Sequence, residues 1–201
     1  MISILNFLKI MTFISLLLVH VSGCAGLLVG GAATIGVASI QERSLKDAAT
    51  DIEIRLRIED QLFRADTTNL FSQVGVTVIE QRVLLVGSVS SENFRDRAAE
   101  ITWGIPKVKE VLNELTINSN SSLIDSAKDA RISIILTGLL LTDTEILDIN
   151  FSHSVSDQVV YIVGIAQDKK EVKKVIHHAR TIRGVKKVIN HILLKSDNRR
   201  T

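Results

Sequence analysis

The sequence repeats itself once, and this repeat limits the possible folds more than any other feature. The segment Arg82–Gly87 (RVLLVG) aligns with Val159–Gly164 (VVYIVG) at a shift of 77 positions. Ile105–Leu115 aligns with Ile182–Ile192 at the same shift. Because two copies of one unit fill most of the chain, the fold must be a module of about 70 residues that is built twice.

The first half of each copy predicts a helix followed by a β-hairpin. In the first copy, residues 51–63 begin with an N-cap aspartate and carry apolar residues at four-residue steps, as an amphipathic helix does. Val74–Ile79 alternates valines with other residues, and Val83–Val86 is a short apolar run. The intervening Glu80–Gln81 predicts a tight turn between two antiparallel strands.

The second half of each copy predicts a helix and a third strand. The second helix starts at Ser91 and is stopped by Pro106, and residues 108–117 form a strand. After a crossover helix this strand should lie parallel to the strand that ends at Gly87. We therefore expect an α+β fold of two αββαβ modules, each a three-stranded mixed sheet packed by two helices. Two helices cover one face of such a sheet, so we expect the other face to be polar or available.

The expected boundaries place the first module at residues 50–118, the second at 125–195 and a basic tail at 196–201. The two halves differ in charge. Residues 42–117 carry 10 Lys and Arg against 13 Asp and Glu, whereas residues 125–201 carry 13 against 9. The second module is therefore the one that should favour an anionic partner.

The N-terminal region has the pattern of an export signal. Residues 10–41 contain no Asp, Glu, Lys or Arg, and Ile10–Val19 has the length of a secretory apolar segment. Val21–Cys24 (VSGC) resembles the lipobox of bacterial lipoproteins, in which the cysteine thiol takes a diacylglycerol. We predict a signal peptide at residues 1–23, then a lipidated Cys24 and a flexible tether rich in Gly and Ala that reaches residue 49.

An uncleaved membrane helix is the alternative for this region, because Ala25–Ile40 is also apolar. Five glycines between Gly23 and Gly36 disfavour it, since each costs up to about 1 kcal/mol in a helix interior relative to alanine. Cys24 is the only cysteine, so no disulfide can form within one chain. Lipidation would consume the thiol.

The order of the motifs resembles a known family. Residues 83–89 (VLLVGSV) precede a helix and then Val108-x-x-Val111-x-Asn113, and the second copy repeats this ending at residues 184–190. With the lipobox, the chain resembles the dual BON-domain outer-membrane lipoproteins of the DolP and YraP type. The resemblance implies αββαβ modules and binding of anionic phospholipid by the first helix of the second module, in support of envelope integrity. In the lipoproteins that this segment resembles, the residue after the cysteine influences sorting, and by that resemblance Ala25 implies an outer-membrane anchor that faces the periplasm.

The first helix of the second module differs from its counterpart in polarity. Where the first copy has Arg57 and Gln61, the second has isoleucine and leucine. Arg131, Ile135 and Leu139 follow one another at four-residue steps and so lie on one side of the helix. This side is expected to point away from the core residues that begin with Ile132. We predict that the membrane or partner surface consists of Lys128, Arg131, Ile135 and Leu139. The alternative is that this stripe packs on the first module and that the nearby lysines are an ordinary solvated face.

No pattern of catalytic or cofactor-binding residues is evident. His177 and His178 are adjacent and would point about 100° apart on a helix, so we interpret them and His191 as solvated or capping residues with no metal. Trp103 is interpreted as packing at a helix terminus. We therefore expect no enzyme, no cofactor and no nucleic-acid partner. The second functional hypothesis is a periplasmic scaffold in which the same stripe docks an envelope protein or a second copy of the chain.

The assignment of Cys24 makes the first testable prediction. Protein extracted from membranes should begin at Cys24 and carry acyl chains, because the signal peptidase removes residues 1–23. Intact mass spectrometry measures both changes at once, and Cys24→Ser should leave the chain at its full length. A native protein that begins at Met1 without acyl groups would contradict the anchor and favour the uncleaved helix.

Overall fold

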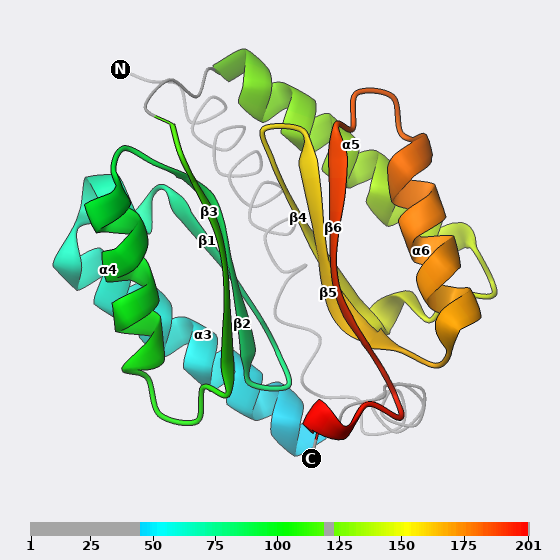
Figure 1. Ribbon diagram of the computed structural model, residues 1–201, viewed down its shortest axis with the longest axis horizontal. Coiled ribbons are helices and arrows are strands. Elements are labelled where there is room, and N and C mark those ends of the chain that lie inside the picture. Colours follow the sequence, from blue (N-terminus) through cyan, green and yellow to red (C-terminus); the bar gives the residue numbers. More distant parts are fainter. Residues whose placement is uncertain (1–44, 119–122, 201) are drawn as a thin grey trace, which may run out of the picture. The chain divides into compact units, whose positions relative to one another are not determined.

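The computed structural model describes residues 45–118 and 123–200 (Figure 1). The predicted signal peptide, Cys24 and most of the predicted tether lie outside these residues. Within the described ranges, no helix is both long and apolar enough to cross a membrane. All described residues belong to one compact unit of the chain.

Both halves of the described chain show the predicted order of elements. The first module consists of α3 (Leu45–Ala65), a π-helical turn (Thr67–Phe71), β1 (Val74–Ile79), β2 (Arg82–Val89), α4 (Glu92–Trp103) and β3 (Glu110–Ile117). The second consists of α5 (Leu123–Thr142), a 3₁₀ turn (Asp148–Asn150), β4 (Phe151–Ser156), β5 (Val159–Ala166), α6 (Lys169–Thr181), β6 (Lys187–Leu194) and a final 3₁₀ turn (Asn198–Arg200). The predicted α+β fold is confirmed in both copies.

The sheets have the predicted mixed topology. In the first module β1 pairs antiparallel with β2, and β2 pairs parallel with β3. The strands β4, β5 and β6 pair in the same way. Val83 lies beside Val111 in the first sheet and Val160 lies beside Val188 in the second. Both of these pairs differ by the 77 positions of the sequence repeat, so the repeat extends to the strand register.

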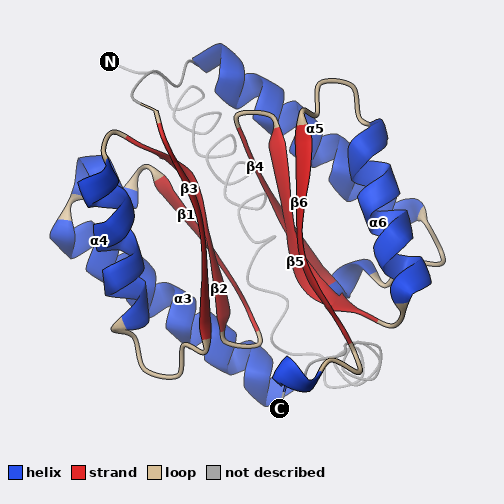
Figure 2. Ribbon diagram, in the orientation of Figure 1, coloured by secondary structure: helices blue, strands red, loops and turns tan. Residues whose placement is uncertain are grey.

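Each module builds its core between one face of its sheet and its two helices (Figure 2). From α3, Ile54, Ile58 and Leu62 are at most 1% exposed and belong to the core of the first module, where α3 lies against β1. Ala98 of α4, fully buried, contributes to the same core. In the second module the equivalent core residues of the helices are Ile132, Leu136, Leu140, Val175 and Ala179. The four-residue steps predicted for the first helix are therefore core contacts.

The second face of each sheet is apolar and buried, which corrects the expectation that it is polar or available. One buried cluster draws residues from both sheets, so each sheet covers the bare face of the other. Its members are Ile79, Leu84 and Val86 of the first module and Tyr161, Val163, Ile165 and Leu193 of the second. The two modules thus share a third hydrophobic core.

Polar contacts surround this shared core. Arg82, nearly buried, donates from Nη1 to the carbonyl of His191 at 3.1 Å. His191 Nε2 lies 2.9 Å from Glu114 Oε1. Arg200, in the predicted basic tail, donates from Nε and Nη2 to the two carboxylate oxygens of Glu80 at 2.9 and 2.6 Å. The C-terminal tail is therefore fixed on the hairpin of the first module.

Glycine allows a close approach of two backbone segments at equivalent places in β2 and β5. Gly87 has φ +146°, and a Cβ there would lie 2.0 Å from the carbonyl oxygen of Gln73. A Cβ at Gly164 would lie 2.5 Å from the carbonyl oxygen of Asn150. No side chain fits at either position, so both strands require glycine there. The strands continue past these glycines, β2 to Val89 and β5 to Ala166, which corrects the expectation that the first of them ends at Gly87.

A helix carboxylate holds the tight turn of each hairpin, from the buried Asp51 in the first module and the half-buried Asp129 in the second. Glu80 and Gln81 have φ values of +52° and +64°, a left-handed geometry that usually requires Asn or Gly. The Asp51 carboxylate accepts from the backbone N–H groups of both residues at 2.9 and 2.8 Å. Asp129 does the same for Asp157 and Gln158 at 2.9 and 2.8 Å. The helix therefore fixes the turn of its own module.

This contact corrects the predicted role of Asp51. The helix begins at Leu45, earlier than the expected Asp51, and Asp51 lies inside it with 3% of its surface exposed. An aspartate at a helix start and one that binds a distant turn look alike in sequence. Ser91 does cap α4 as predicted, since its side chain accepts from the N–H of Phe94.

Replacing Asp51 with alanine should lower the free energy of unfolding by about 1–3 kcal/mol, because two N–H groups of a strained turn lose their acceptor. Asp129→Ala should have an effect of the same size. Urea denaturation measures both. The matched control is Asp60→Ala, which removes an exposed carboxylate from the same helix and should change stability by less than about 0.5 kcal/mol. Equal effects at Asp51 and Asp60 would show that the turn forms without the helix carboxylate.

Candidate functional site

Helix α5 exposes large apolar side chains on the side opposite its core residues. Ile134 is 73% exposed and Leu141 is 68% exposed. Gly138, between them, has no atom within 4 Å of the place where a Cβ would lie. These three positions fall on one helix side because seven residues make almost two full turns. We call Ile134, Gly138 and Leu141 the outer face of α5.

The predicted stripe differs from this outer face. Ile135 and Leu139 are only partly exposed and pack against the core of the second module, so the prediction that they point away from it is wrong. The reason is geometric, since a four-residue step advances 400° and each step turns the stripe 40° toward the core. Arg131, at the start of the stripe, is exposed. Whether these residues bind a membrane or a partner stays a prediction.

The two predicted cations lie at the N-terminal half of α5 and already have partners. Lys128 Nζ lies 2.9 Å from Asp125 Oδ1, with half of its side chain still exposed. Arg131 Nη1 donates to the carbonyl of Arg183 at 3.2 Å, which ties α5 to the loop after α6. Both side chains line one shallow hollow with Gly184. Their charges therefore remain at the surface while their positions are fixed.

Helix α6 presents a basic surface. Its N-cap Asp168 accepts from the N–H groups of Lys170 and Glu171 at 2.7 and 2.9 Å. Its exposed residues at three- and four-residue steps are Lys169, Lys173, His177 and Arg180. Across the helix, five Lys and Arg stand against one Glu, a net charge of +4. The equivalent helix α4 carries two Arg against three acidic residues, a net charge of −1.

The outer face of α5 and the basic side of α6 belong to one helical layer. Both helices cover the same face of the sheet β4–β6 (Figure 2), and they contact each other. Their solvent-exposed sides are therefore turned away from that sheet. The result is a surface in which exposed aliphatic side chains lie beside a cluster of cations.

An ion cluster joins the end of α5 to α6. Asp143 accepts from His178 Nε2 at 2.9 Å and from Lys174 Nζ at 3.2 Å, and Lys174 also pairs with Glu145. The hydrogen bond from His178, followed by that from the Glu145 backbone and the contacts with Lys174, lowers the pKa of Asp143 to about 2. Lys174 in turn has a raised pKa, chiefly through its hydrogen bond to Glu145. The cluster fixes the spacing of the two helices.

Two of the three histidines interpreted as solvated or capping residues are held in polar contacts. His178 binds Asp143, and His191 binds Glu114 of the other module, with 22% and 17% of their side chains exposed. His177 alone of the three is exposed. Among residues 45–118 and 123–200, no group of three or more His, Cys, Asp or Glu side chains could hold a metal ion.

Trp103 does not pack at the helix terminus as predicted. It is 55% exposed at the end of α4. The helix end is instead buried through the preceding residue, Thr102, whose hydroxyl donates to the carbonyl of Ala98 at 2.8 Å.

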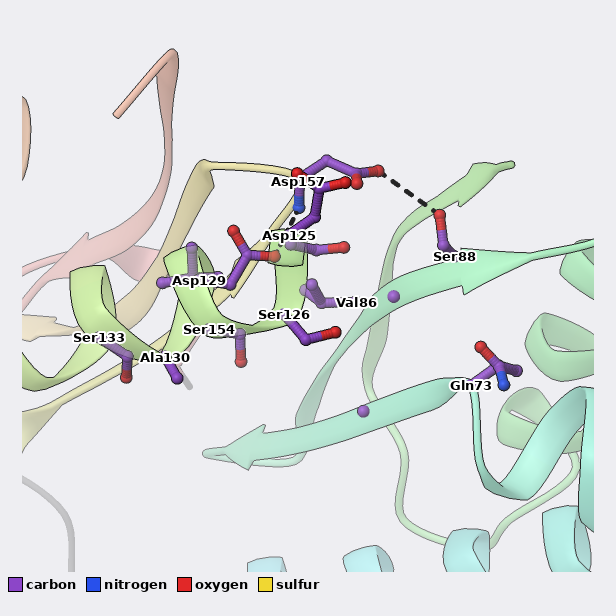
Figure 3. Close-up of a pocket in the computed structure, with 14 residues that line it drawn as sticks. Gln73, Val86, Ser88, Asp125, Ser126, Asp129, Ala130, Ser133, Ser154 and Asp157 are labelled. Carbon is purple, nitrogen blue, oxygen red and sulfur yellow. Dashed lines mark hydrogen bonds between the residues drawn. The ribbon is translucent and has the colours of Figure 1, made fainter. Parts of the chain in front are cut away.

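A polar hollow of about 460 Å³ lies between β1 and β2 on one side and α5 and β4 on the other (Figure 3). Ser88 faces Asp157 across it at 3.5 Å, and Gln73 lines the first module's side. The Asp129 carboxylate in its wall already accepts two backbone N–H groups of the hairpin turn. Asp129 therefore serves the hairpin, and Ser88 with Asp157 serves the contact between the modules.

The lowered pKa of Asp143 predicts how the free energy of unfolding changes with acid. Its pKa of about 2 in the folded protein lies below the ordinary 3.8, so its ionised form favours folding. This stabilisation is complete above pH 3.8 and is lost as the pH falls through about 2. Asp143→Asn should be less stable than the wild type at neutral pH, and the difference should shrink between pH 4 and 2. Acid titration of the unfolding free energy measures it, with Asp148→Asn as the control for loss of one carboxylate; a difference independent of pH would contradict the pairing.

Comparison with known proteins agrees with the repeat and the topology. The BON domain family matches residues 50–119 and 128–196. An uncharacterised protein from the gshII 5′ region of Anaplasma centrale is 36% identical over 146 residues, which cover 72% of this chain and 95% of that protein. The outer membrane lipoprotein DolP of Haemophilus influenzae is 24% identical over 172 residues, 85% of this chain and 88% of DolP.

Among solved structures, CdsD, a structural protein of the type III secretion system of Chlamydia trachomatis, shares 13% identity. The match covers 69% of this chain and 91% of that one, with a TM-score of 0.30. The family rests on the sequence matches, which cover both modules and agree with their αββαβ order. The chain belongs to the BON-domain family, as a dual BON-domain protein similar to DolP.

Proposed function

We propose that this chain is a non-catalytic outer-membrane lipoprotein, anchored through Cys24 and facing the periplasm, whose second module binds anionic phospholipid. The observation that carries the proposal is the surface of α5 and α6, where exposed aliphatic residues lie beside a cluster of cations. The relative DolP is named as an outer membrane lipoprotein, which supports the compartment. In this role the protein supports the integrity of the cell envelope.

The apolar part of the surface is suited to insertion among lipid headgroups. Ile134 and Leu141 keep more than two thirds of their surface exposed, although aliphatic residues of this size are usually buried. Removing such a side chain from water is worth about 1.5–3 kcal/mol when burial is complete. None of the residues of α5 is aromatic, so aliphatic side chains alone would enter the interface. This arrangement favours shallow insertion of the helix side.

The basic part of the surface supplies the preference for anionic lipid. Each Lys or Arg close to an anionic membrane contributes about 1 kcal/mol at physiological salt. Helix α6 carries a net charge of +4, and Arg131 adds a cation at the N-terminal half of α5. Lys170 and Lys174 are paired with acidic residues, so Lys169, Lys173 and Arg180 are the stronger candidates for lipid phosphates. Binding should therefore weaken as salt is added.

Vesicle flotation with a fragment of residues 40–201 tests this surface without the lipid anchor. The double variant Ile134→Glu with Leu141→Glu should lower binding to phosphatidylglycerol vesicles at least tenfold, because two aliphatic side chains no longer leave water and two negative charges meet the anionic lipid. Arg131→Gln should lower it about fivefold, the equivalent of 1 kcal/mol. Vesicles of phosphatidylcholine alone should bind weakly.

The matched control is Leu56→Glu, which replaces an exposed leucine, 55% accessible, on the equivalent helix of the first module and should leave binding unchanged. The half-buried Ile135 and Leu139 are unsuitable for this test because a glutamate there would enter the core. Equal vesicle binding by the wild type and the Ile134/Leu141 variant would remove α5 from the lipid-binding surface. No binding by the wild type at low salt would contradict the proposed function.

A further inference from the structure

Helix α3 of the first module carries an exposed apolar stripe that the function proposed above does not use. Ile52 and Leu56 are each 55% exposed, and Phe63 is 51% exposed. Phe71, 43% exposed, packs edge-on against Phe63 with ring centroids 5.2 Å apart. The core residues of α3 lie on the opposite side of the helix. Ordinary packing within the module therefore does not account for this stripe.

The spacing of the stripe is that of a coiled-coil seam. Counting from Ala49, the positions on this side of α3 are 49, 52, 56, 59 and 63, with alternating steps of three and four residues. A seven-residue repeat of this kind keeps one line of side chains facing a second helix along the whole length. An amphipathic helix on a membrane has the same three- and four-residue steps, so the spacing fits a helical partner or a membrane. The charges beside the stripe decide between the two.

The charges around the stripe disfavour an anionic membrane. Glu59 lies on the stripe and Asp60 lies next to it. Basic residues of α3 are paired with acidic residues of the same helix, as in Arg57 with Glu53 at 2.8 Å. Across α3, four Lys and Arg stand against five Asp and Glu, a net charge of −1. Helices that lie on anionic membranes are rich in Lys and Arg on their polar side, and α3 is not.

We propose that the α3 stripe docks the α3 helix of a second copy of this chain, in an antiparallel arrangement. In this arrangement Ile52 lies opposite Leu56 of the second copy, and Ala49 lies opposite Glu59 of the second copy. Because Ala49 is small, the Glu59 carboxylate has room to reach water. Lys46 then lies near Asp60 of the second copy, and the two-fold symmetry forms this pair twice. A single self-complementary patch is what a symmetric dimer needs.

The size of the stripe sets the strength of the contact. Four side chains that are each about half exposed leave roughly 300–400 Å² of apolar surface per copy. Two copies would bury less than the roughly 1,200 Å² of a standard stable complex, so the dimer is weak in dilute solution. Confining both copies to one membrane raises their effective concentration and favours pairing. The dimer is thus expected chiefly when the chain is bound to a bilayer.

Disulfide crosslinking of the full chain in phosphatidylcholine vesicles tests the pairing. Chains with Ile52→Cys should crosslink to chains with Leu56→Cys at least tenfold more than Arg57→Cys chains crosslink to one another. Arg57 is an exposed residue off the stripe, and its variant has the same Cys24 background. Phe63→Cys should not crosslink to itself, because antiparallel helices would hold the two positions about 27 Å apart at 1.5 Å per residue. Self-crosslinking at Phe63 would overturn the antiparallel arrangement.

Substitution at the exposed surface gives a second measurement that does not depend on thiols. Leu56→Glu should reduce amine crosslinking between full-length chains in the same vesicles at least tenfold, whereas Leu141→Glu on the second module should not. Equal crosslinking of the Leu56→Glu variant and the wild type would overturn the proposal. Loss of vesicle binding by Leu56→Glu, with no change in association, would assign the stripe to lipid instead. Because Leu141→Glu affects lipid binding and Leu56→Glu affects association, failure of either proposal is distinguishable from failure of the other.

Discussion

The contact between the two sheets is the interaction on which the rest of the structure depends. Two helices cover one face of a three-stranded sheet, and the other face of each sheet here is apolar. A module alone would expose this face to water, which would favour aggregation. The second copy of the module removes the problem by supplying the missing layer. Arg82 and His191 add polar contacts across the boundary, so the pairing has a defined register as well as an apolar area.

The helices and strands could be predicted from the sequence, whereas most contacts between them could not. Periodicity identified the strands and helices because side chains of both modules alternate between core and solvent in the usual way. The all-apolar run at Val83–Val86 was also a signal for a strand buried on both faces, which is how Leu84 and Val86 reach the second module. The role of Asp51 could not be predicted, because its partners lie 29 and 30 residues away in a turn that only the fold brings near.

The exposed surface of α5 was harder to predict than its core. Apolar residues occupy several sides of this helix, so periodicity identifies the buried line at Ile132 and Leu136 but does not separate its flanks from its outer face. A stripe drawn at four-residue steps drifts toward the core, whereas seven-residue steps, as from Ile134 to Leu141, stay on one side. The same seven-residue test would have found the stripe on α3 from sequence alone. The ion contacts of His178 and His191 required the tertiary structure, since both partners are remote in sequence.

The two copies differ most where packing constrains them least. Their cores, strand registers and aspartate-bound turns are equivalent, because a substitution there would cost stability in either module. The outward sides of their helices have diverged, so that α4 carries −1 and its counterpart α6 carries +4. The shared core between the sheets places each pair of helices on the side of its sheet turned away from the other module. A duplicated module can therefore offer two chemically different surfaces, one slightly acidic with an apolar stripe on α3 and one basic, without either competing for the same partner.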